Sequence, residues 1–283
     1  MIKNQVENTF ESMSSSYDDC DVVVWGVPFD GTVSNRPGTR FGPQAIITEF
    51  INLESYSPYQ QKDLEDYKIC DLGELAIPIG NTEKAMNAIE QNILDMLVDN
   101  KRIISLGGEH LISYPIIKSY IASYPKLHVI QLDAHADLRD DYLGEKLSHA
   151  TVMRRVYENL NKGTLTQLGI RSGTKGEFEF SKANTHMNKF DLGDISSVIK
   201  SVGDDPVYLS IDLDILDPSI FPGTGTPEPG GITFKELMAG MIELSNLNIV
   251  GADIVELAPH YDQSGGSTVV ACKVLRELLL MMV

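Results

Sequence analysis

A short run of charged residues follows directly on an apolar stretch near the middle of this chain. Residues 127–132 (LHVIQL) are typical of a buried strand, and residues 133–137 (DAHAD) come next. Side chains alternate along an extended backbone, so Asp133, His135 and Asp137 are predicted to share one face. Two carboxylates and an imidazole crowded at a buried strand end are unfavourable unless a cation lies among them. A turn rich in aspartate is the alternative for any of these residues alone.

Two further apolar runs end in residues of the same kinds. Residues 102–106 (RIISL) are followed by 107–110 (GGEH), whose paired glycines allow a sharp exit and a close backbone approach. Residues 207–211 (VYLSI) are followed by Asp212 and Asp214, which are spaced to share a face. Ligands bind beyond the carboxyl ends of strands in open α/β sheets, so these segments are predicted to meet in one crevice.

The three segments together offer a set of metal ligands made of oxygen and imidazole only. The candidates are His110, Asp133, His135, Asp137, Asp212 and Asp214. Six such groups exceed the need of a single ion with open positions, and carboxylates can bridge two ions. The set therefore predicts two divalent cations, and hard ligands favour Mn²⁺ over Zn²⁺.

Strand-like and helix-like patterns alternate along the whole chain. Predicted strands cover 21–27, 69–73, 102–106, 127–132, 166–170, 207–214 and 249–257; predicted helices cover 44–53, 82–100, 113–124, 148–160 and 267–282, with another starting at Thr233. Asn81 or Thr82 is expected to cap the second helix, and Thr233 and Glu236 have capping-box spacing. The alternation predicts a single domain over residues 1–283, a three-layer α/β/α fold around a mostly parallel sheet.

Three ordered motifs give the chain a resemblance to the ureohydrolases, the family of arginases, agmatinases, formimidoylglutamases and guanidinobutyrases. They are GGEH at 107–110, DAHAD at 133–137 and the segment 210–231, SIDLDILDPSIFPGTGTPEPGG, whose last part looks like the agmatinase branch. The resemblance runs from about Trp25 to the C-terminal helix. It implies an arginase-like fold and two Mn²⁺ ions per chain.

The resemblance also implies a role for each site residue. One ion would take His110, Asp133, Asp137 and Asp212, and the other His135, Asp133, Asp212 and Asp214. Glu256 would hold the substrate guanidinium, for which a planar carboxylate is suited. A hydroxide bridging the metals would attack the guanidinium carbon, with Asp137 and His149 as candidates for proton delivery to the leaving amine. By itself, His149 would be interpreted as an ordinary surface histidine.

The loop after DAHAD bears on the choice of substrate. Arginases carry short polar residues there, whereas this chain has LRDDY at 138–142. Asp140 and Asp141 suit an amine, so the predicted substrate is agmatine, a small cation that would be hydrolysed to putrescine and urea. Arg139 could instead meet a carboxylate, so guanidinobutyrate stays an alternative, as do arginine and other guanidino or formimino compounds. A metal-binding protein without activity would be expected to have lost Asp133, Asp212 or Glu256.

Charge and composition set the remaining limits. A net charge of -17 argues against nucleic-acid binding and suits a cationic substrate, although an acidic surface alone would explain it equally well. Cys20, Cys70 and Cys272 are few and have no metal-binding spacing, so buried free thiols in a reducing compartment are expected. No apolar stretch is long enough for a membrane span, which predicts a cytoplasmic protein without a membrane partner. Family members often form trimers or hexamers, so a homo-oligomer is expected.

Overall fold

A nine-stranded sheet forms the centre of the computed structural model, which describes residues 5–6 and 13–283. Its strand order is β1-β5-β2-β6-β11-β10-β7-β8-β9. β1 is antiparallel to β5, and all other neighbours in this sheet are parallel. The strands are β1 (Gln5–Val6), β2 (Val22–Val27), β5 (Ile69–Leu75), β6 (Arg102–Gly107), β7 (His128–Leu132), β8 (Leu165–Ile170), β9 (His186–Lys189), β10 (Pro206–Asp212) and β11 (Asn248–Val255).

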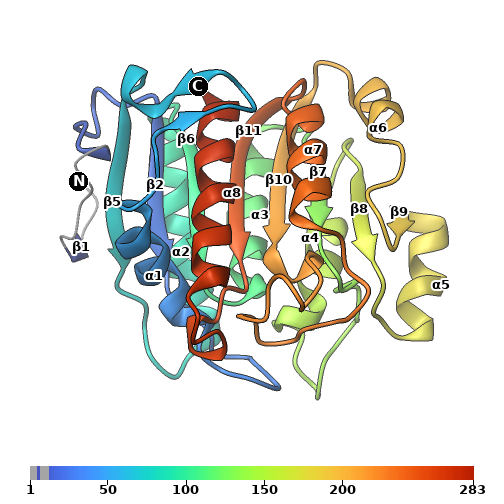
Figure 1. Cartoon of the computed structure of the whole chain (residues 1–283). Coiled ribbons are helices and arrows are strands. Elements are labelled where there is room, and N and C mark those ends of the chain that lie inside the picture. Colours follow the sequence, from blue (N-terminus) through green and yellow to red (C-terminus); the bar gives the residue numbers. More distant parts are fainter. Residues whose placement is uncertain (1–4, 7–12) are drawn as a thin grey trace.

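Helices cover both faces of this sheet, as Figure 1 shows. On one face α1 and α7 lie beside α8, and on the other α3 lies between α2 and α4. The helices are α1 (Gly42–Phe50), α2 (Thr82–Val98), α3 (Ser113–Ser123), α4 (Val152–Asn159), α5 (Lys175–Asn184), α6 (Ile195–Val202), α7 (Phe234–Leu244) and α8 (Gly266–Met282). This arrangement confirms the predicted three-layer α/β/α fold. None of the helices in the described part of the chain is long and apolar enough to span a bilayer.

Each face of the sheet has its own hydrophobic core, and β2 illustrates how one strand serves both. Val22 and Val24 belong to the core under α1, α7 and α8, whereas Val23, Trp25 and Val27 belong to the core under α2, α3 and α4. A strand covered on both sides cannot alternate between apolar and polar residues. The continuous apolar runs in the sequence therefore become the inner strands of a parallel sheet.

Local capping chemistry sets the start of several helices. The side chain of Asn81 accepts a hydrogen bond from the Lys84 amide at 2.8 Å, so Asn81 is the cap of α2. Thr233 and Glu236 form the predicted capping box at α7. An equivalent box starts α5, with Thr174 as its cap. Such side chains satisfy amide groups that have no partner within the helix.

Several elements differ from the sequence-based expectations. β9, α5, α6 and the short hairpin of β3 (Tyr56–Ser57) and β4 (Lys62–Asp63) were not predicted. The helix expected from residue 148 begins as a 3₁₀ turn over His149–Thr151, and α4 starts at Val152. The strands expected to reach 214 and 257 end at Asp212 and Val255, because the chain turns there to form the site described next.

Candidate metal centre

The predicted site residues come together at one edge of the sheet. In the strand order, β6, β11, β10 and β7 are consecutive neighbours and run parallel. Their carboxyl ends therefore meet, and a predicted site residue lies at or just beyond each end: His110 after β6, Asp133 after β7, Asp212 at the end of β10 and Glu256 after β11. The convergence expected from sequence is thus present.

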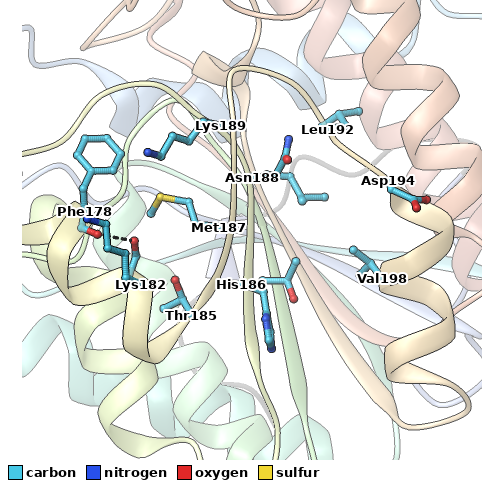
Figure 2. Close-up of a pocket in the computed structure, with 13 residues that line it drawn as sticks. Phe178, Lys182, Thr185, His186, Met187, Asn188, Lys189, Leu192, Asp194 and Val198 are labelled. Carbon is cyan, nitrogen blue, oxygen red and sulfur yellow. Dashed lines mark hydrogen bonds between the residues drawn. The ribbon is translucent and has the colours of Figure 1, made fainter.

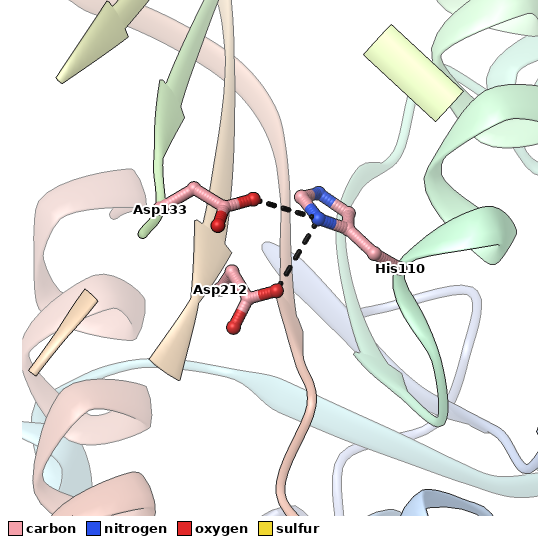
Figure 3. Close-up of side chains that lie close together, drawn as sticks. All are labelled: His110, Asp133 and Asp212. Carbon is pink, nitrogen blue, oxygen red and sulfur yellow. Dashed lines mark ion pairs between the residues drawn. The ribbon is translucent and has the colours of Figure 1, made fainter. Parts of the chain in front are cut away.

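His110 lies at the centre of a buried cluster of carboxylates. Its Nδ1 atom is 3.0 Å from Asp133 Oδ2, 3.2 Å from Asp137 Oδ2 and 3.3 Å from Asp212 Oδ2. Figure 3 shows the carboxylates of Asp133 and Asp212 directed at this nitrogen. One imidazole nitrogen can donate at most one proton, so it cannot satisfy three carboxylates. This geometry fits a cation shared by the four side chains.

The other ring nitrogen of His110 indicates which nitrogen is left for a metal ion. His110 Nε2 lies 3.0 Å from Ser210 Oγ, and the Ser210 hydroxyl donates to Asp253 Oδ1 at 2.8 Å. Since the serine proton is directed at Asp253, the serine oxygen accepts from Nε2–H. Nδ1, which faces the carboxylates, is therefore the nitrogen that would bind a metal ion in place of its proton.

A second cluster overlaps the first. His135 Nδ1 is 3.0 Å from Asp214 Oδ2 and 3.7 Å from Asp133 Oδ1, and these three side chains could hold one ion. Asp133 belongs to both clusters, as expected of a bridging carboxylate. Asp212 groups with His110 and Asp133, and its Oδ1 accepts the Asp214 amide at 2.8 Å. Two adjacent positions that share a carboxylate fit a pair of divalent ions.

The electrostatics of the clusters show why a cation is needed. Burial and then the charge of Asp133 raise the pKa of Asp137 to about 7, and burial with Asp214 and Asp133 raises that of Asp212 well above its usual value. Burial alone would lower the pKa of His110, but the three carboxylates raise it well above 6.5. Protons thus compensate the excess negative charge in the protein alone, and divalent ions would replace them.

Two site residues adopt an unusual backbone conformation. Asp137 has φ 54° and Glu256 has φ 67°, both in the left-handed region. Side chains other than glycine reach that region at a cost of about 1–2 kcal/mol, and such residues cluster at functional sites. The turn at Asp137 places its carboxylate beside His110, and the turn at Glu256 ends β11 at the cavity.

A cavity of about 300 Å³ opens above both clusters. The predicted residues that line it are His110, His135, Asp137, His149, Asp212 and Glu256. The structure adds Ser34, Tyr142, Glu177 and Thr226, which the sequence analysis did not single out. The capping-box spacing of Thr174 and Glu177 was a signal for α5, but it did not indicate that Glu177 faces the site. The loop 28–43 contributes Ser34, so it lies at the mouth of the cavity.

Glu256 lies at the cavity wall without a charged partner. Its Oε1 accepts the backbone amide of His110 at 2.8 Å, and burial raises its pKa to about 8. No ion pair among residues 13–283 involves this carboxylate. A buried carboxylate of this kind is stabilised by a cation that enters the cavity.

His149 lines the same cavity. Its Nε2 atom lies 3.3 Å from Ser34 Oγ, and its ring meets that of Tyr142 edge-on at 5.5 Å. Burial lowers the pKa of His149 to about 4, and the nearby His135 and His110 add to this effect. The imidazole is therefore neutral at pH 7 and able to exchange a proton with a bound molecule.

The acidic loop after DAHAD differs from the expectation. Asp140 Oδ1 pairs with Arg155 at 2.9 Å, Asp141 Oδ1 accepts the Gly144 amide at 3.1 Å, and neither residue lines the cavity. Arg139 does line it. The Arg139 guanidinium stacks on the ring of Tyr142, 4.8 Å from its centre, and Arg139 Nε lies 3.6 Å from Glu177 Oε2. Asp140 and Asp141 therefore do not form an acidic rim at the cavity, and an arginine beside a buried glutamate lies there instead.

A second cavity, of about 480 Å³, lies beside the edge strand β9 between α5 and α6. Figure 2 shows Lys182, His186 and Lys189 around it, and all three are exposed. His186 lies on this surface, whereas His128 is buried and contacts Thr164 Oγ1 at 2.8 Å. The three cysteines are free and buried, as predicted.

Comparisons with known proteins agree with these observations. A family model described as the arginase family matches residues 20–281. Agmatinases of Bacillus cereus and Bacillus subtilis are 46% and 44% identical to the chain, over 94% and 96% of its length and 93% and 95% of theirs. The structure of agmatine ureohydrolase of Thermoplasma volcanium matches with a TM-score of 0.87 and 32% identity, covering 96% of this chain and 93% of that one.

Proposed function

The chain belongs to the arginase family of ureohydrolases and is an agmatinase-like enzyme, and from this premise we propose that it hydrolyses agmatine to putrescine and urea. The observation that carries the proposal is the arrangement at the cavity floor. Two overlapping Asp/His clusters share Asp133, and the carboxylate of Glu256, which has no charged partner among the described residues, lines the same cavity. A cationic guanidinium complements this arrangement, whereas a neutral or anionic group does not.

The metal part of the proposal is two Mn²⁺ ions per chain. The first ion is assigned to His110, Asp133, Asp137 and Asp212, because the carboxylates of the three aspartates surround Nδ1 of His110. The second is assigned to His135, Asp133 and Asp214, with Asp212 as a further bridging ligand by family resemblance. When bound, such ions make water strongly nucleophilic at neutral pH and polarise the substrate.

The residues of the chain orient the substrate and handle its protons. Glu256 accepts hydrogen bonds from the guanidinium and holds its carbon above the clusters. The water oxygen forms a bond to that carbon and becomes the oxygen of urea, and the bond from the carbon to the nitrogen carrying the aminobutyl chain breaks, with the proton for the leaving nitrogen coming from the water. This nitrogen must gain a proton to leave as putrescine. Asp137 lies beside His110, and both Asp137 and His149 line the cavity, so these two residues are assigned to proton transfer.

The outer part of the cavity bears on substrate choice. Arg139 and Glu177 form an ion pair in this part of the cavity, with Arg139 Nε 3.6 Å from Glu177 Oε2. Guanidinobutyrate is the second candidate, because its carboxylate would pair with Arg139. Agmatine is preferred because the guanidinium of Arg139 already has Glu177 and Tyr142 as partners.

The remaining features are proposed from the family resemblance and from the cysteines. Residues 1–283 are assigned to one domain, and the enzyme is proposed to work as a homotrimer or homohexamer. Three free, buried thiols support a reducing compartment such as the cytoplasm.

Urea release measured with agmatine, arginine, guanidinobutyrate and formimidoylglutamate tests the proposal. With Mn²⁺ present, agmatine is expected to exceed arginine in catalytic efficiency by at least about a hundredfold, or roughly 2.7 kcal/mol. Glu256→Gln is the matched variant, because Gln keeps the acceptor for the His110 amide but removes the charge. Its efficiency with agmatine should fall at least roughly tenfold at unchanged metal content, since charged hydrogen bonds contribute about 1.5–3 kcal/mol. Equal use of arginine, or full activity of the variant, would contradict the proposal.

A further inference from the structure

Gly108 and Glu109 of the GGEH motif contact Val27 and the loop 28–43 that follows it. The amide of Gly108 donates to Val27 O at 3.1 Å, and the amide of Glu109 donates to Phe29 O at 2.7 Å. A Cβ atom on Gly108 would lie 1.9 Å from Phe29 O, which no side chain allows. The glycine therefore serves the close approach of this loop, and Glu109 follows at the point of contact.

Glu109 is fully buried, and its carboxylate accepts hydrogen bonds from this loop. Thr32 donates its backbone amide to Glu109 Oε2 at 2.9 Å and its hydroxyl to Glu109 Oε1. No ion pair in the described part of the chain includes Glu109. Thr32 is thus clamped at two points by a buried carboxylate, the kind of acceptor that forms the stronger hydrogen bonds.

The Thr32 hydroxyl connects this clamp to His149. Because its proton is directed at Glu109, the hydroxyl oxygen has lone pairs to accept with, and the backbone amide of His149 donates to it at 3.2 Å. Two residues further along the same loop, Ser34 Oγ lies 3.3 Å from His149 Nε2. The loop therefore contacts both the backbone and the ring of this histidine, which comes from a segment 117 residues away from Thr32 in sequence.

We propose that Glu109 and Thr32 are positioning residues that hold His149 at the mouth of the metal-centre cavity. The hydrogen bonds run in one direction, from the His149 amide to the Thr32 hydroxyl and from there to the Glu109 carboxylate. Glu109 thereby accepts both the amide and the hydroxyl of Thr32. The proposal deepens the proposed function and rests on it, because it gives His149 a role in proton transfer.

A double-mutant cycle tests whether Thr32 acts through His149. Thr32→Val keeps the shape and removes the hydroxyl, Thr32→Ser keeps the hydroxyl, and His149→Asn removes the imidazole. We expect Thr32→Val to lower kcat for agmatine roughly 10- to 100-fold, the size of effect that misplacing a reacting group produces. KM and Mn²⁺ content should stay within about twofold, and Thr32→Ser should keep most of kcat. In the His149→Asn background, Thr32→Val should change kcat by less than about twofold, because coupled residues are not additive.

The outcomes separate this inference from the proposed function. If His149→Asn lowers kcat but Thr32→Val multiplies that loss, the positioning role is refuted and the role of His149 stands. If His149→Asn leaves kcat unchanged, the proton-transfer role itself fails. Thr48→Val is the matched control, because Thr48 is exposed and its hydroxyl bonds only within α1; its kcat should equal that of the wild type. If Thr32→Val does not fold, Glu109→Gln takes its place in the same cycle. A smaller loss of kcat is expected for Glu109→Gln, and a loss that multiplies with that of His149→Asn would again refute the inference.

Discussion

The cavity above the metal centre and the cavity beside β9 are both lined by polar residues, yet they differ in how those residues are held. At the metal centre, side chains from four neighbouring strand ends converge, and His110, Asp133, Asp212 and Asp214 are almost fully buried. Beside β9, the larger cavity carries exposed lysines and a histidine on the last strand of the sheet. Exposed charges are solvated and screened, so each interacts only weakly with its neighbours. Burial together with convergence makes the first cavity reactive.

The largest expected effect comes from the carboxylate that belongs to both clusters. Asp133→Asn should abolish measurable urea release and lower the bound Mn²⁺. Mutating a residue that only hydrogen-bonds to a metal ligand typically lowers activity or metal affinity roughly 10–100-fold, and the loss of activity here should be larger. Asp194→Asn is the matched change in the β9 cavity, where Asp194 caps α6 through the Ser197 amide. Asparagine caps helices as well as aspartate, so activity should be unchanged. Activity lost in both variants would remove the contrast between the cavities.

Metal removal should destabilise the protein through the first cavity only. Ligand present at a hundred times its dissociation constant adds about 2.7 kcal/mol to stability. For domains slightly smaller than this chain, each kcal/mol shifts Tm by roughly 2–4 °C, so chelation should lower Tm by about 5 °C or more. Added Mn²⁺ should restore both Tm and activity. Fully active protein with one ion per chain, measured by metal analysis, would contradict the binuclear assignment.

The buried imidazole of His149 predicts a smaller, pH-dependent effect. Its pKa is about 4 in the folded protein, below the usual 6.5, because of burial and the positive charges of His135, His110 and Arg139. As pH falls from 6.5 to 4, the unfolded chain therefore takes up this proton before the folded one, and stability decreases. One such group contributes at most about 1.4 kcal/mol per pH unit. His149→Asn should thus lose stability less steeply than wild type over this range in urea denaturation; equal slopes would show that His149 titrates normally.

The smallest effect is expected from Asp140 and Asp141, which do not form an acidic rim at the cavity. Because Asp140 pairs with Arg155 and Asp141 caps a turn, changing both to Asn should alter the agmatine-to-arginine preference by less than about twofold. Electrostatic steering by a true rim would change association roughly 10- to 10³-fold. Steady-state kinetics at low ionic strength, where steering is strongest, is the sensitive measurement. A tenfold fall in this preference would show that Asp140 and Asp141 attract the substrate after all.

Much of the fold and most of the site followed from local sequence patterns. Apolar runs such as residues 22–27 indicated buried strands of a doubly covered sheet, and the parallel strand order brought the carboxylates that follow these strands to one edge. The capping residues Asn81 and Thr233 marked helix starts by their own hydrogen bonds. The elements around β9 escaped prediction, because an exposed edge strand such as HMNK has little apolar periodicity to detect.

The sequence by itself thus determined the order of strands and helices, the family and the ligand types at each strand end, since all of these depend on neighbours along the chain. Only the tertiary structure decided which side chains meet. It directed Asp140 and Asp141 away from the cavity, gave Asp137 and Glu256 their left-handed turns, and connected Glu109 through Thr32 to His149. Such contacts join residues many positions apart, and their energies depend on burial and on the position of single protons. Neither quantity is encoded in local spacing.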